Sequence, residues 1–520
     1  MTSATGPVLA LVPGTRKAPG AGANTGPFIH PQFTDERVFA GLHHAGYDAW
    51  LGHVWHAAAC TRPIKLRGDI RYIDPATGEL VRTIPTIGMP DGVIYKPCGN
   101  RRATTCPGCA ETYRRDAYHL IRAGLIGGKG ITPTVATHPA LFVTFTAPSF
   151  GPVHARPVRQ HTCADKTRCT CQPQPCHARR DALTCEHGRP AACFTRHRRD
   201  DSRLGQPLCP DCYDYPAHVV WNNNAGELWR RTKQAIERHL NQAARHRGLL
   251  TQVRVAHGKA AEYQARGAVH FHALLRLDGY DPADPGALLP APPGITITDL
   301  DEATRWAADA ISYRTPPHPA RPEGWAIGWG TEIDIRPITL TGTGTVTDLA
   351  VASYLAKYST KGTEPAGHAS ARITTETIDL YANSGGTHPE RLIDACWRIG
   401  QHPGYVSLRR WAHMLGFGGH FLTKARRYSI RFCDLRQARI TYRRGQDTGP
   451  DHGPIRTGDH TDEETTLVVG TFTYAGTGWK TTGDALLANT AADQARKRRE
   501  VGREQLADEY NFTTTSRQAA

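Results

Sequence analysis

The alternation of apolar and polar residues in the central part of the chain predicts a series of strands and helices. The strand pattern covers four segments, at residues 141–146, 252–262, 269–277 and 331–338. The helical pattern covers three, at residues 227–247, 298–312 (with Trp306 and Ile311 facing inward) and 348–361. The resulting order, β-α-β-β-α-β-α, predicts an α+β fold of the split-βαβ (ferredoxin-like) type with an antiparallel sheet.

Two histidines interrupt the apolar strand at residues 269–277. Because side chains alternate across a strand, His270 and His272 project from one face while Phe271 packs on the other. Two neighbouring imidazoles fill a core poorly, but they can hold a divalent metal. The alternative is a pair of core histidines that are satisfied by hydrogen bonds.

The predicted helix at residues 348–361 carries two tyrosines one turn apart. Thr347 suits an N-cap and Gly362 suits the position after the helix. Tyr354 and Tyr358 share a face, and each is followed three residues later by a lysine, Lys357 or Lys361. A tyrosine can attack phosphate as a nucleophile, and a nearby cation favours the phenolate. The alternative is an amphipathic core helix with exposed lysines.

Taken in order, these motifs resemble those of the HUH endonucleases, specifically the rolling-circle replication initiators. The motifs are the strand at 141–146, the triplet His270-Phe-His272 and the double tyrosine unit at 354–361. The paired tyrosines are similar to those of the two-tyrosine branch, which includes the gene A proteins of small isometric phages. The stretch from Cys60 to Tyr428 resembles initiators of actinobacterial plasmids and integrative elements, most closely in the phrases at 204–215 and 410–417.

The resemblance implies an HUH core that nicks single-stranded or extruded origin DNA. Tyr354 would attack first and form a 5′-phosphotyrosine link, and Tyr358 would make a second transfer. Lys357 and Lys361 would hold the phosphate or stabilise the attacking oxygen. Glu262 is the expected third metal ligand beside the histidines, with Asp334 as a substitute. Such a set with open positions suits Mg²⁺ or Mn²⁺.

The 14 cysteines predict structural zinc rather than disulfides in a chain of this kind. Cys60, Cys98, Cys106 and Cys109 form one expected Cys₄ site. A second site is expected from Cys185, Cys193, Cys209 and Cys212, with His187 or His197 as substitutes. Cys163, Cys169, Cys171 and Cys176 could form another site or none. A thioredoxin-like redox role is disfavoured, because the Cys-x-x-Cys pairs lack a strand–helix context.

The charge of the chain suits a polyanionic partner. Lys and Arg number 63 against 48 acidic residues, a net charge of +15. Residues 421–444 are rich in arginine with interleaved aromatics, which suits phosphate contact and base stacking; the DNA-binding candidates are Arg426, Arg427, Arg431 and Arg436. A solvated basic strand pair is the alternative. No phosphate-binding loop of a helicase occurs, so we expect a host helicase and a DNA polymerase as partners.

The composition also predicts how the chain is divided. We expect a disordered tail at 1–35, an N-terminal zinc region at 36–135, a nuclease core at 136–365 with a zinc insertion at about 155–220, and a basic C-terminal region at 366–520. Neither a long apolar segment nor a signal peptide is evident, so a cytoplasmic location is expected.

Three other functions share some of these features. An HUH-type transposase would use the same chemistry. A conjugative relaxase is disfavoured, because those enzymes usually place the tyrosine ahead of the histidines. A non-catalytic, zinc-containing DNA-binding repressor would account for the cysteines and the charge, but not for the histidine pair and the double tyrosine.

Overall fold

The structure, a computed structural model, describes residues 46–158, 172–178, 183–250, 252–338, 347–366, 372–447 and 467–518. The expected tail at 1–35 lies outside the described residues, as do Cys163, Cys169 and Cys171. The chain divides into two compact units. One combines residues up to Ala58 with those from Trp479 onward, and the other runs from Ala59 to Gly478. Every candidate site residue belongs to the second unit.

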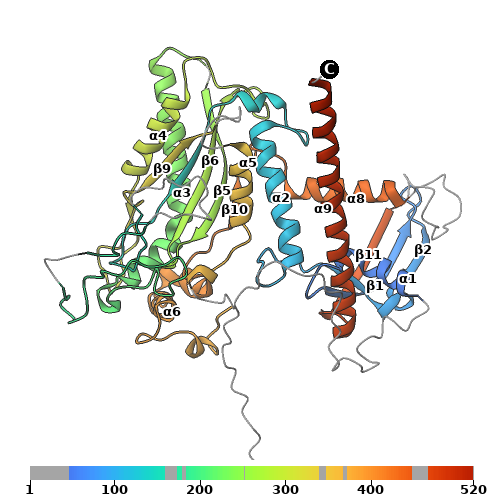
Figure 1. Ribbon diagram of the computed structural model, residues 1–520, viewed down its shortest axis with the longest axis horizontal. Coiled ribbons are helices and arrows are strands. Elements are labelled where there is room, and N and C mark those ends of the chain that lie inside the picture. The colour runs from blue at the N-terminus through green and yellow to red at the C-terminus, as the bar shows by residue number, and fades with distance from the viewer. Residues whose placement is uncertain are drawn as a thin grey trace, which may run out of the picture. The chain divides into compact units, whose positions relative to one another are not determined.

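The helices and strands follow one another along the chain as labelled in Figure 1. The helices are α1 (Tyr47–Val54), α2 (Pro107–Ile126), α3 (Tyr215–His246), α4 (Ile297–Ala310), α5 (Asp348–Tyr358), α6 (His388–Ile399), α7 (Val406–Arg410), α8 (Phe432–Asp447) and α9 (Thr482–Gln518). The strands are β1 (Ile64–Ile73), β2 (Leu80–Pro85), β3 (Ile94–Lys96), β4 (Ala140–Phe145), β5 (Gln252–Tyr263), β6 (Val269–Tyr280), β7 (Tyr313–Arg314), β8 (Ala326–Ile327), β9 (Ile333–Pro337), β10 (Leu422–Lys424) and β11 (Leu467–Thr477).

The central sheet has the strand order β10-β5-β6-β4-β9, and every neighbouring pair in it is antiparallel. The strands β4 and β5, which α3 connects, are therefore parallel to each other with β6 inserted between them. This is the split-βαβ arrangement, so the predicted element order and the antiparallel sheet are confirmed. The tight turn between β5 and β6 is closed by a backbone hydrogen bond from Gly267 to Gln264.

Helices cover both faces of this sheet. Figure 1 shows α3 and α4 on one side and α5 with α2 on the other. On β6, Val269, Phe271 and Leu275 pack under α3 in the larger core. Leu274, on the opposite face, packs against Leu355 of α5 in the smaller core. The alternation along β6 therefore places His270 and His272 on the face that α5 covers.

The helix α3 begins much earlier than the predicted start at Glu227. The Asp214 side chain caps it by accepting a hydrogen bond from the Ala217 amide, and the first turns bury Val219 and Trp221. The inward orientation predicted for Trp306 is wrong: the side chain of this α4 residue is 46% exposed, and its ring lies against His239 of α3. An aromatic at helical spacing can cover a neighbouring helix from outside, and here it does.

Strand pairing joins segments that are distant in the sequence. β1 pairs with β11, and β10 pairs with β5 as an edge strand of the central sheet. The expected N-terminal zinc region, through β1, is thus paired with the expected C-terminal region. The same C-terminal region, through β10, is paired with the expected nuclease core. Residues 146–214, between β4 and α3, contain the cysteine-rich insertion, held by short turns and isolated β-bridges where it is described. In the described part of the chain, no helix is both long and apolar enough to cross a bilayer.

Candidate active site and metal-binding groups

Three predicted metal ligands meet on the α5 side of the central sheet. Glu262 of β5 lies directly opposite His270 of β6 in the strand register. Glu262 Oε2 lies 3.2 Å from Nε2 of His270 and 3.2 Å from Nε2 of His272, and the two imidazole nitrogens are 2.9 Å apart. The Thr144 hydroxyl, 3.1 Å from Nδ1 of His272, holds that ring with Nε2 toward the group.

These distances fit a six-coordinate divalent ion. Adjacent ligands of an octahedral ion with bonds of about 2.1 Å lie about 3 Å apart, which matches the three separations. Two imidazoles and one carboxylate would leave about three positions for water or phosphate oxygens. Asp334, the substitute ligand, is not part of the group: its side chain is 53% exposed and pairs with Arg336 at 3.0 Å.

Both tyrosines of α5 face the histidine group. The Tyr354 hydroxyl lies 3.3 Å from Nε2 of His272. The rings of Tyr354 and Tyr358 are 4.4 Å apart, and the Tyr358 ring lies 5.7 Å from that of His272. The helix α5 is fixed at both ends, because Thr347 caps its first turn and the Arg101 guanidinium donates to the Ser359 and Lys361 carbonyls.

The two lysines occupy different places. Lys361 Nζ lies 3.1 Å from Glu262 Oε1 and 4.0 Å from the centroid of the Tyr358 ring. Lys357 is exposed, with its Nζ 5.9 Å from the same ring. The structure therefore brings Lys361 into the group and leaves Lys357 at its edge.

Burial and hydrogen bonding act in opposite directions on the ionisable groups of this site. Burial favours the neutral form of Glu262, but hydrogen bonds from His270 and His272 outweigh it and bring the pKa of Glu262 to about 2. Burial lowers the pKa of His272, which keeps its imidazole neutral as metal binding requires. Burial, with the neighbouring Tyr358 and Glu262, raises the pKa of Tyr354 far above its usual value.

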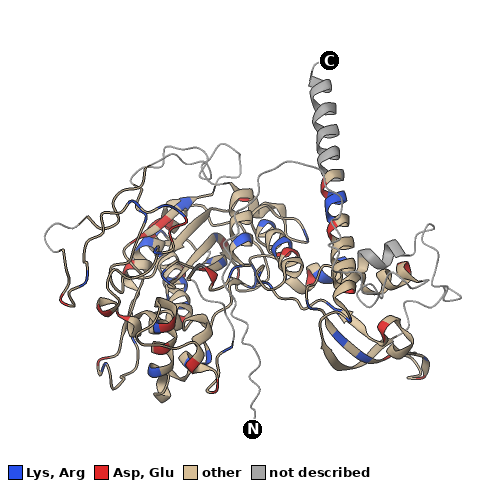
Figure 2. Cartoon of the chain, turned by 60° about the horizontal axis from the view of Figure 1, so that its bottom comes forward, with Lys and Arg blue, Asp and Glu red and all other residues tan. Residues whose placement is uncertain are grey.

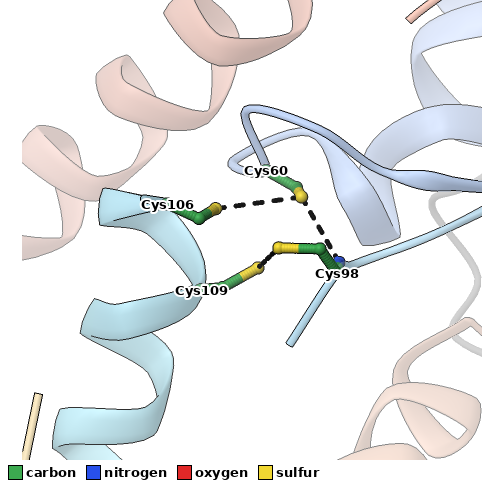
Figure 3. A group of neighbouring side chains, drawn as sticks. All are labelled: Cys60, Cys98, Cys106 and Cys109. Atoms are coloured by element: carbon green, nitrogen blue, oxygen red, sulfur yellow. Dashed lines mark hydrogen bonds between the residues drawn. The ribbon is translucent and has the colours of Figure 1, made fainter. Parts of the chain in front are cut away.

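The first expected zinc set comes together as predicted. Figure 3 shows Cys106, the N-cap residue of α2, and Cys109, in its first turn, facing Cys60 and Cys98, which lie in separate loops. The sulfur atoms of Cys98 and Cys109 are 3.7 Å apart and those of Cys60 and Cys106 are 3.8 Å apart. A tetrahedral zinc ion with Zn–S bonds of about 2.3 Å would separate its ligands by about 3.8 Å. The four thiols can therefore hold a structural metal ion such as zinc.

The second expected set does not come together as one group. Cys185, Cys209 and Cys212 do gather, but the fourth member is His187, whose Nδ1 lies 3.2 Å from the Cys212 sulfur. Cys193 lies instead with His154, Cys176 and His197. The spacing of cysteines along an irregular loop does not determine which of them meet. The sequence alone therefore cannot decide whether Cys193 or a histidine is the fourth ligand beside Cys185, Cys209 and Cys212. Both groups can hold a metal ion.

The basic segment at 421–444 differs from the predicted surface in its aromatics. Arg426, Arg427, Arg431 and Arg436 are all exposed. Phe421 and Tyr428, however, are buried, and the Tyr428 hydroxyl donates to the Ile121 carbonyl, so neither ring is free to stack on a base. The alternative of a basic strand pair is also wrong, because the segment forms the short strand β10 followed by α8.

Sequence reasoning missed a groove beside the edge strand β10. It has a volume of about 340 Å³, and its lining includes Arg101, Arg102, Trp411, Phe417 and His420. The Arg101 guanidinium lies 3.7 Å from the centroid of the Phe421 ring and reaches the end of α5. No local pattern points to this groove, since its cations and aromatics come from segments far apart in the sequence.

Comparisons with known proteins agree with one another. A sequence model of the family described as "Replication initiator protein, pSAM2" matches residues 46–493. A protein of Streptomyces ambofaciens described as a replication initiator protein is 40% identical over 476 residues, which cover 89% of this chain and 94% of that protein. No solved structure matches the chain.

Proposed function

The chain belongs to the family of replication initiator proteins represented by that of pSAM2, and we propose that it initiates rolling-circle replication as an HUH-type endonuclease of the two-tyrosine branch. The observation that carries the proposal is the contact between the Tyr354 hydroxyl and His272, within a group of two imidazoles and one carboxylate. The proposal is supported because a tyrosine hydroxyl, which can act as a nucleophile, lies beside side chains that could hold the divalent ion that phosphoryl transfer needs.

The reaction would exchange one phosphoester bond for another. The Tyr354 oxygen forms a bond to the scissile phosphorus while the bond to the 3′ oxygen breaks. The phenolic proton leaves the tyrosine and the 3′ oxygen gains one, so no water is consumed. The products are a 3′-hydroxyl that a polymerase can extend and a 5′-phosphotyrosine that conserves the bond for later strand closure.

The surrounding residues position the reacting groups. A Mg²⁺ or Mn²⁺ ion held by Glu262, His270 and His272 would polarise the scissile phosphate and favour the ionised phenol. Thr144 orients His272, and Lys361 holds the second oxygen of Glu262 beside Tyr358. Tyr358, whose ring lies 4.4 Å from that of Tyr354, would make the second transfer at the end of a round of replication.

We place the single strand in the groove beside β10. Its arginines can contact phosphates, and the partly exposed Trp411 offers a face for base stacking. Arg101 links the groove to the end of the tyrosine helix through its hydrogen bonds to Ser359 and Lys361. The exposed arginines Arg426, Arg427, Arg431 and Arg436 would contact the duplex part of the origin. Strand opening would require a host helicase.

The test is a covalent-adduct assay on the full chain. Single strands tiling its own plasmid or element, labelled at either the 5′ or the 3′ end, are incubated with Mn²⁺ or with EDTA and separated on a denaturing gel. We expect a Mn²⁺-dependent shifted band that carries only the 3′ label, because the protein joins the 5′ phosphate. The band should disappear in the Tyr354→Phe, Tyr358→Phe double variant and persist in Tyr474→Phe, a control at an exposed tyrosine of β11.

Two outcomes would contradict the proposal. An adduct that survives the double tyrosine variant would place the nucleophile elsewhere. Strand binding without any adduct, on any tile and with Mn²⁺ present, would favour the non-catalytic repressor.

A further inference from the structure

The cysteine-rich insertion contains a metal-ligand group that the cysteine pattern alone did not indicate. Its members are His154, Cys176, Cys193 and His197, and their ligand atoms all lie within 4.8 Å of one another. Nδ1 of His154 lies 3.2 Å from Nε2 of His197, and the Cys193 sulfur lies 3.6 Å from the same nitrogen. Two thiols and two imidazoles at such separations match the ligands of a tetrahedral zinc ion.

The surroundings of this group are those of a closed structural site. Cys176, Cys193 and His197 are buried. The second ring nitrogen of His197, Nδ1, lies 2.7 Å from the Asp201 carboxylate, which in turn is held by Arg203. A carboxylate that accepts from the far nitrogen of a histidine fixes its tautomer and its orientation for metal binding. Asp201, which is not a member of the ligand group, therefore holds His197 in the orientation that a metal ligand needs.

The two groups of the insertion alternate along the chain. His154 and Cys176 belong to the first group, and Cys185 and His187 to the second. The chain then returns to the first group at Cys193 and His197, and again to the second at Cys209 and Cys212. Each ion would close a loop that contains half of the ligands of the other.

We propose that the eight ligands between His154 and Cys212, with the described segments that carry them, form an interlocked module with two zinc ions, in which the ligand pairs of the two sites alternate. The backbone supports the crossing: His177 and Cys193 exchange two hydrogen bonds, and the Cys176 amide donates to the Thr195 carbonyl. Such a module is held by its ions because the described part of the insertion contributes few core residues. It remains folded only when both sites are filled.

The module also braces the hairpin that carries the candidate catalytic ligands. Gly205, which follows His197 and precedes Cys209 in the chain, lies against the turn from Ala265 to Arg266, where an added Cβ would come within 2.3 Å of the Ala265 carbonyl carbon. Arg266 donates to the carbonyls of Ala147 and Pro148, at the start of the insertion. This turn joins the strand of Glu262 to the strand of His270. The module therefore supports, at its turn, the hairpin that carries these two side chains.

The zinc content of purified full-length variants tests the ligand sets. We expect Cys193→Ser to contain at least one zinc ion per chain less than the wild type, by elemental analysis. His154→Asn should behave in the same way. Two matched controls should keep the wild-type content: Cys433→Ser, at an exposed cysteine outside the groups, and His177→Asn, at the histidine adjacent to Cys176. An unchanged content in Cys193→Ser, or a loss in His177→Asn, would overturn the ligand set.

Hydrogen exchange tests the interlocking. In Cys193→Ser, the amides of Cys185 and Gly188, which belong to the turn of the other site, should lose protection together with that of Cys176. The reciprocal variant, Cys185→Ser, should expose the Cys193 amide. Loss of protection confined to the mutated site would show two independent sites and overturn the module.

Asp201→Asn provides a milder variant in case a ligand substitution unfolds the protein. It keeps all four ligands but removes the carboxylate that orients His197. We expect zinc to be held about 10- to 100-fold more weakly at one site, measured by competition with a chelating dye. Zinc retention equal to that of the wild type would contradict the assignment of His197 as a ligand.

Discussion

Among single residues, His272 has the largest number of roles in the candidate site. Its Nε2 faces Glu262, His270 and the Tyr354 hydroxyl, while its Nδ1 contacts the Thr144 hydroxyl. Its position on β6 follows from strand alternation, but three of its four contacts come from other elements, namely β5, β4 and α5. A substitution there should remove metal binding without removing a large part of the apolar core.

Replacing His272 with alanine should abolish metal-dependent cleavage. The remaining Glu262 and His270 provide only two ligands, which hold Mg²⁺ or Mn²⁺ weakly. Thermal unfolding should shift little, because His272 belongs to neither apolar core and its ring loses mainly its stacking on Phe142. The adduct assay and a melting curve measure the two effects, with His246→Ala at the exposed end of α3 as the control. Cleavage at the wild-type rate would remove His272 from the site.

The order in which the tyrosines act can be tested one at a time. Tyr354 contacts His272 directly, whereas Tyr358 lies one turn further along beside Lys361. Tyr354→Phe should lose the first adduct by at least a hundredfold. Tyr358→Phe should form the adduct normally but fail to join a second strand to the first. A full yield of adduct with Tyr354→Phe would reverse the assigned order.

Among the elements, α2 and the segment that follows β10 meet at a close contact. A Cβ on Gly124 would lie 2.3 Å from Cζ of Tyr428, whose ring is fully buried and whose hydroxyl bonds to Ile121. The glycine therefore allows the helix to approach the ring. The same contact explains why an aromatic residue in a basic segment belongs to the core.

A pair of glycine substitutions measures this contact. Gly124→Ala should lower the free energy of unfolding by roughly 2 kcal/mol, because the buried ring has nowhere to move. Gly226→Ala, at an exposed helical position of α3 with nothing within 4 Å of the added Cβ, should raise it by about 0.5–1 kcal/mol. Denaturant titration of the two variants and the wild type measures both changes in the free energy of unfolding. Equal effects of the two substitutions would show that helix propensity, not the ring contact, dominates.

The strand β5 carries a buried lysine on the face under α3. Lys259 Nζ lies 3.5 Å from the centroid of the Phe271 ring, and burial lowers its pKa from 10.5 to about 7. Between these two pH values the unfolded chain binds a proton that the folded chain does not. Stability should therefore rise with pH from about 7 to about 10.5, as the lysine becomes neutral in the unfolded chain as well.

The effect is isolated by comparing the wild type with Lys259→Met. The difference between the two pKa values corresponds to on the order of 5 kcal/mol, of which the contact with Phe271 offsets a part. At pH 6 the methionine variant should be more stable by about 2 kcal/mol. The advantage should shrink as the pH rises from about 7 and be smallest above pH 10.5, where the lysine is neutral in both states. A difference between the two proteins that does not change with pH would contradict the lowered pKa.

For the whole molecule, a net charge of +15 predicts that DNA binding weakens steeply with salt. However, not all of the positive side chains are equally able to contact a phosphate. Figure 2 shows basic and acidic positions interspersed along α9, where Asp493 pairs with Arg496 and Lys497. Likewise, Arg431 is paired with Asp434 at 2.8 Å. These paired cations offer less to a phosphate than the exposed Arg426 and Arg427.

Measuring origin binding at several salt concentrations distinguishes the arginines that are paired with carboxylates from the exposed Arg426 and Arg427. Replacing both Arg426 and Arg427 with alanine should reduce the slope of log K against log salt by about 2, one for each lost phosphate contact. Arg431→Ala should reduce the slope by less than about 1, the value for one phosphate contact, since the charge of Arg431 is already neutralised by Asp434. Fluorescence anisotropy at several salt concentrations measures the slopes. A larger effect of Arg431 would show that the ion pair opens on DNA.

The sequence by itself determined the features that depend on local period. Alternation along the strand placed His270 and His272 on the same face of the sheet. The helical repeat placed Tyr354 and Tyr358 on the same face of their helix. The order of these elements then predicted the split-βαβ sheet, because few topologies join them. The roles of these residues in catalysis stay predictions, although the structure brings His272 within hydrogen-bond distance of both His270 and Tyr354.

Only the tertiary structure decided the features that depend on distance through space. It assigned Cys193 to one group and His187 to another, because irregular loops have no period from which a partner can be inferred. It buried Phe421 and Tyr428 and left Trp306 outside, because packing depends on which helix happens to cover each face. The groove beside β10 has the same origin: its walls come from segments that the fold alone brings together.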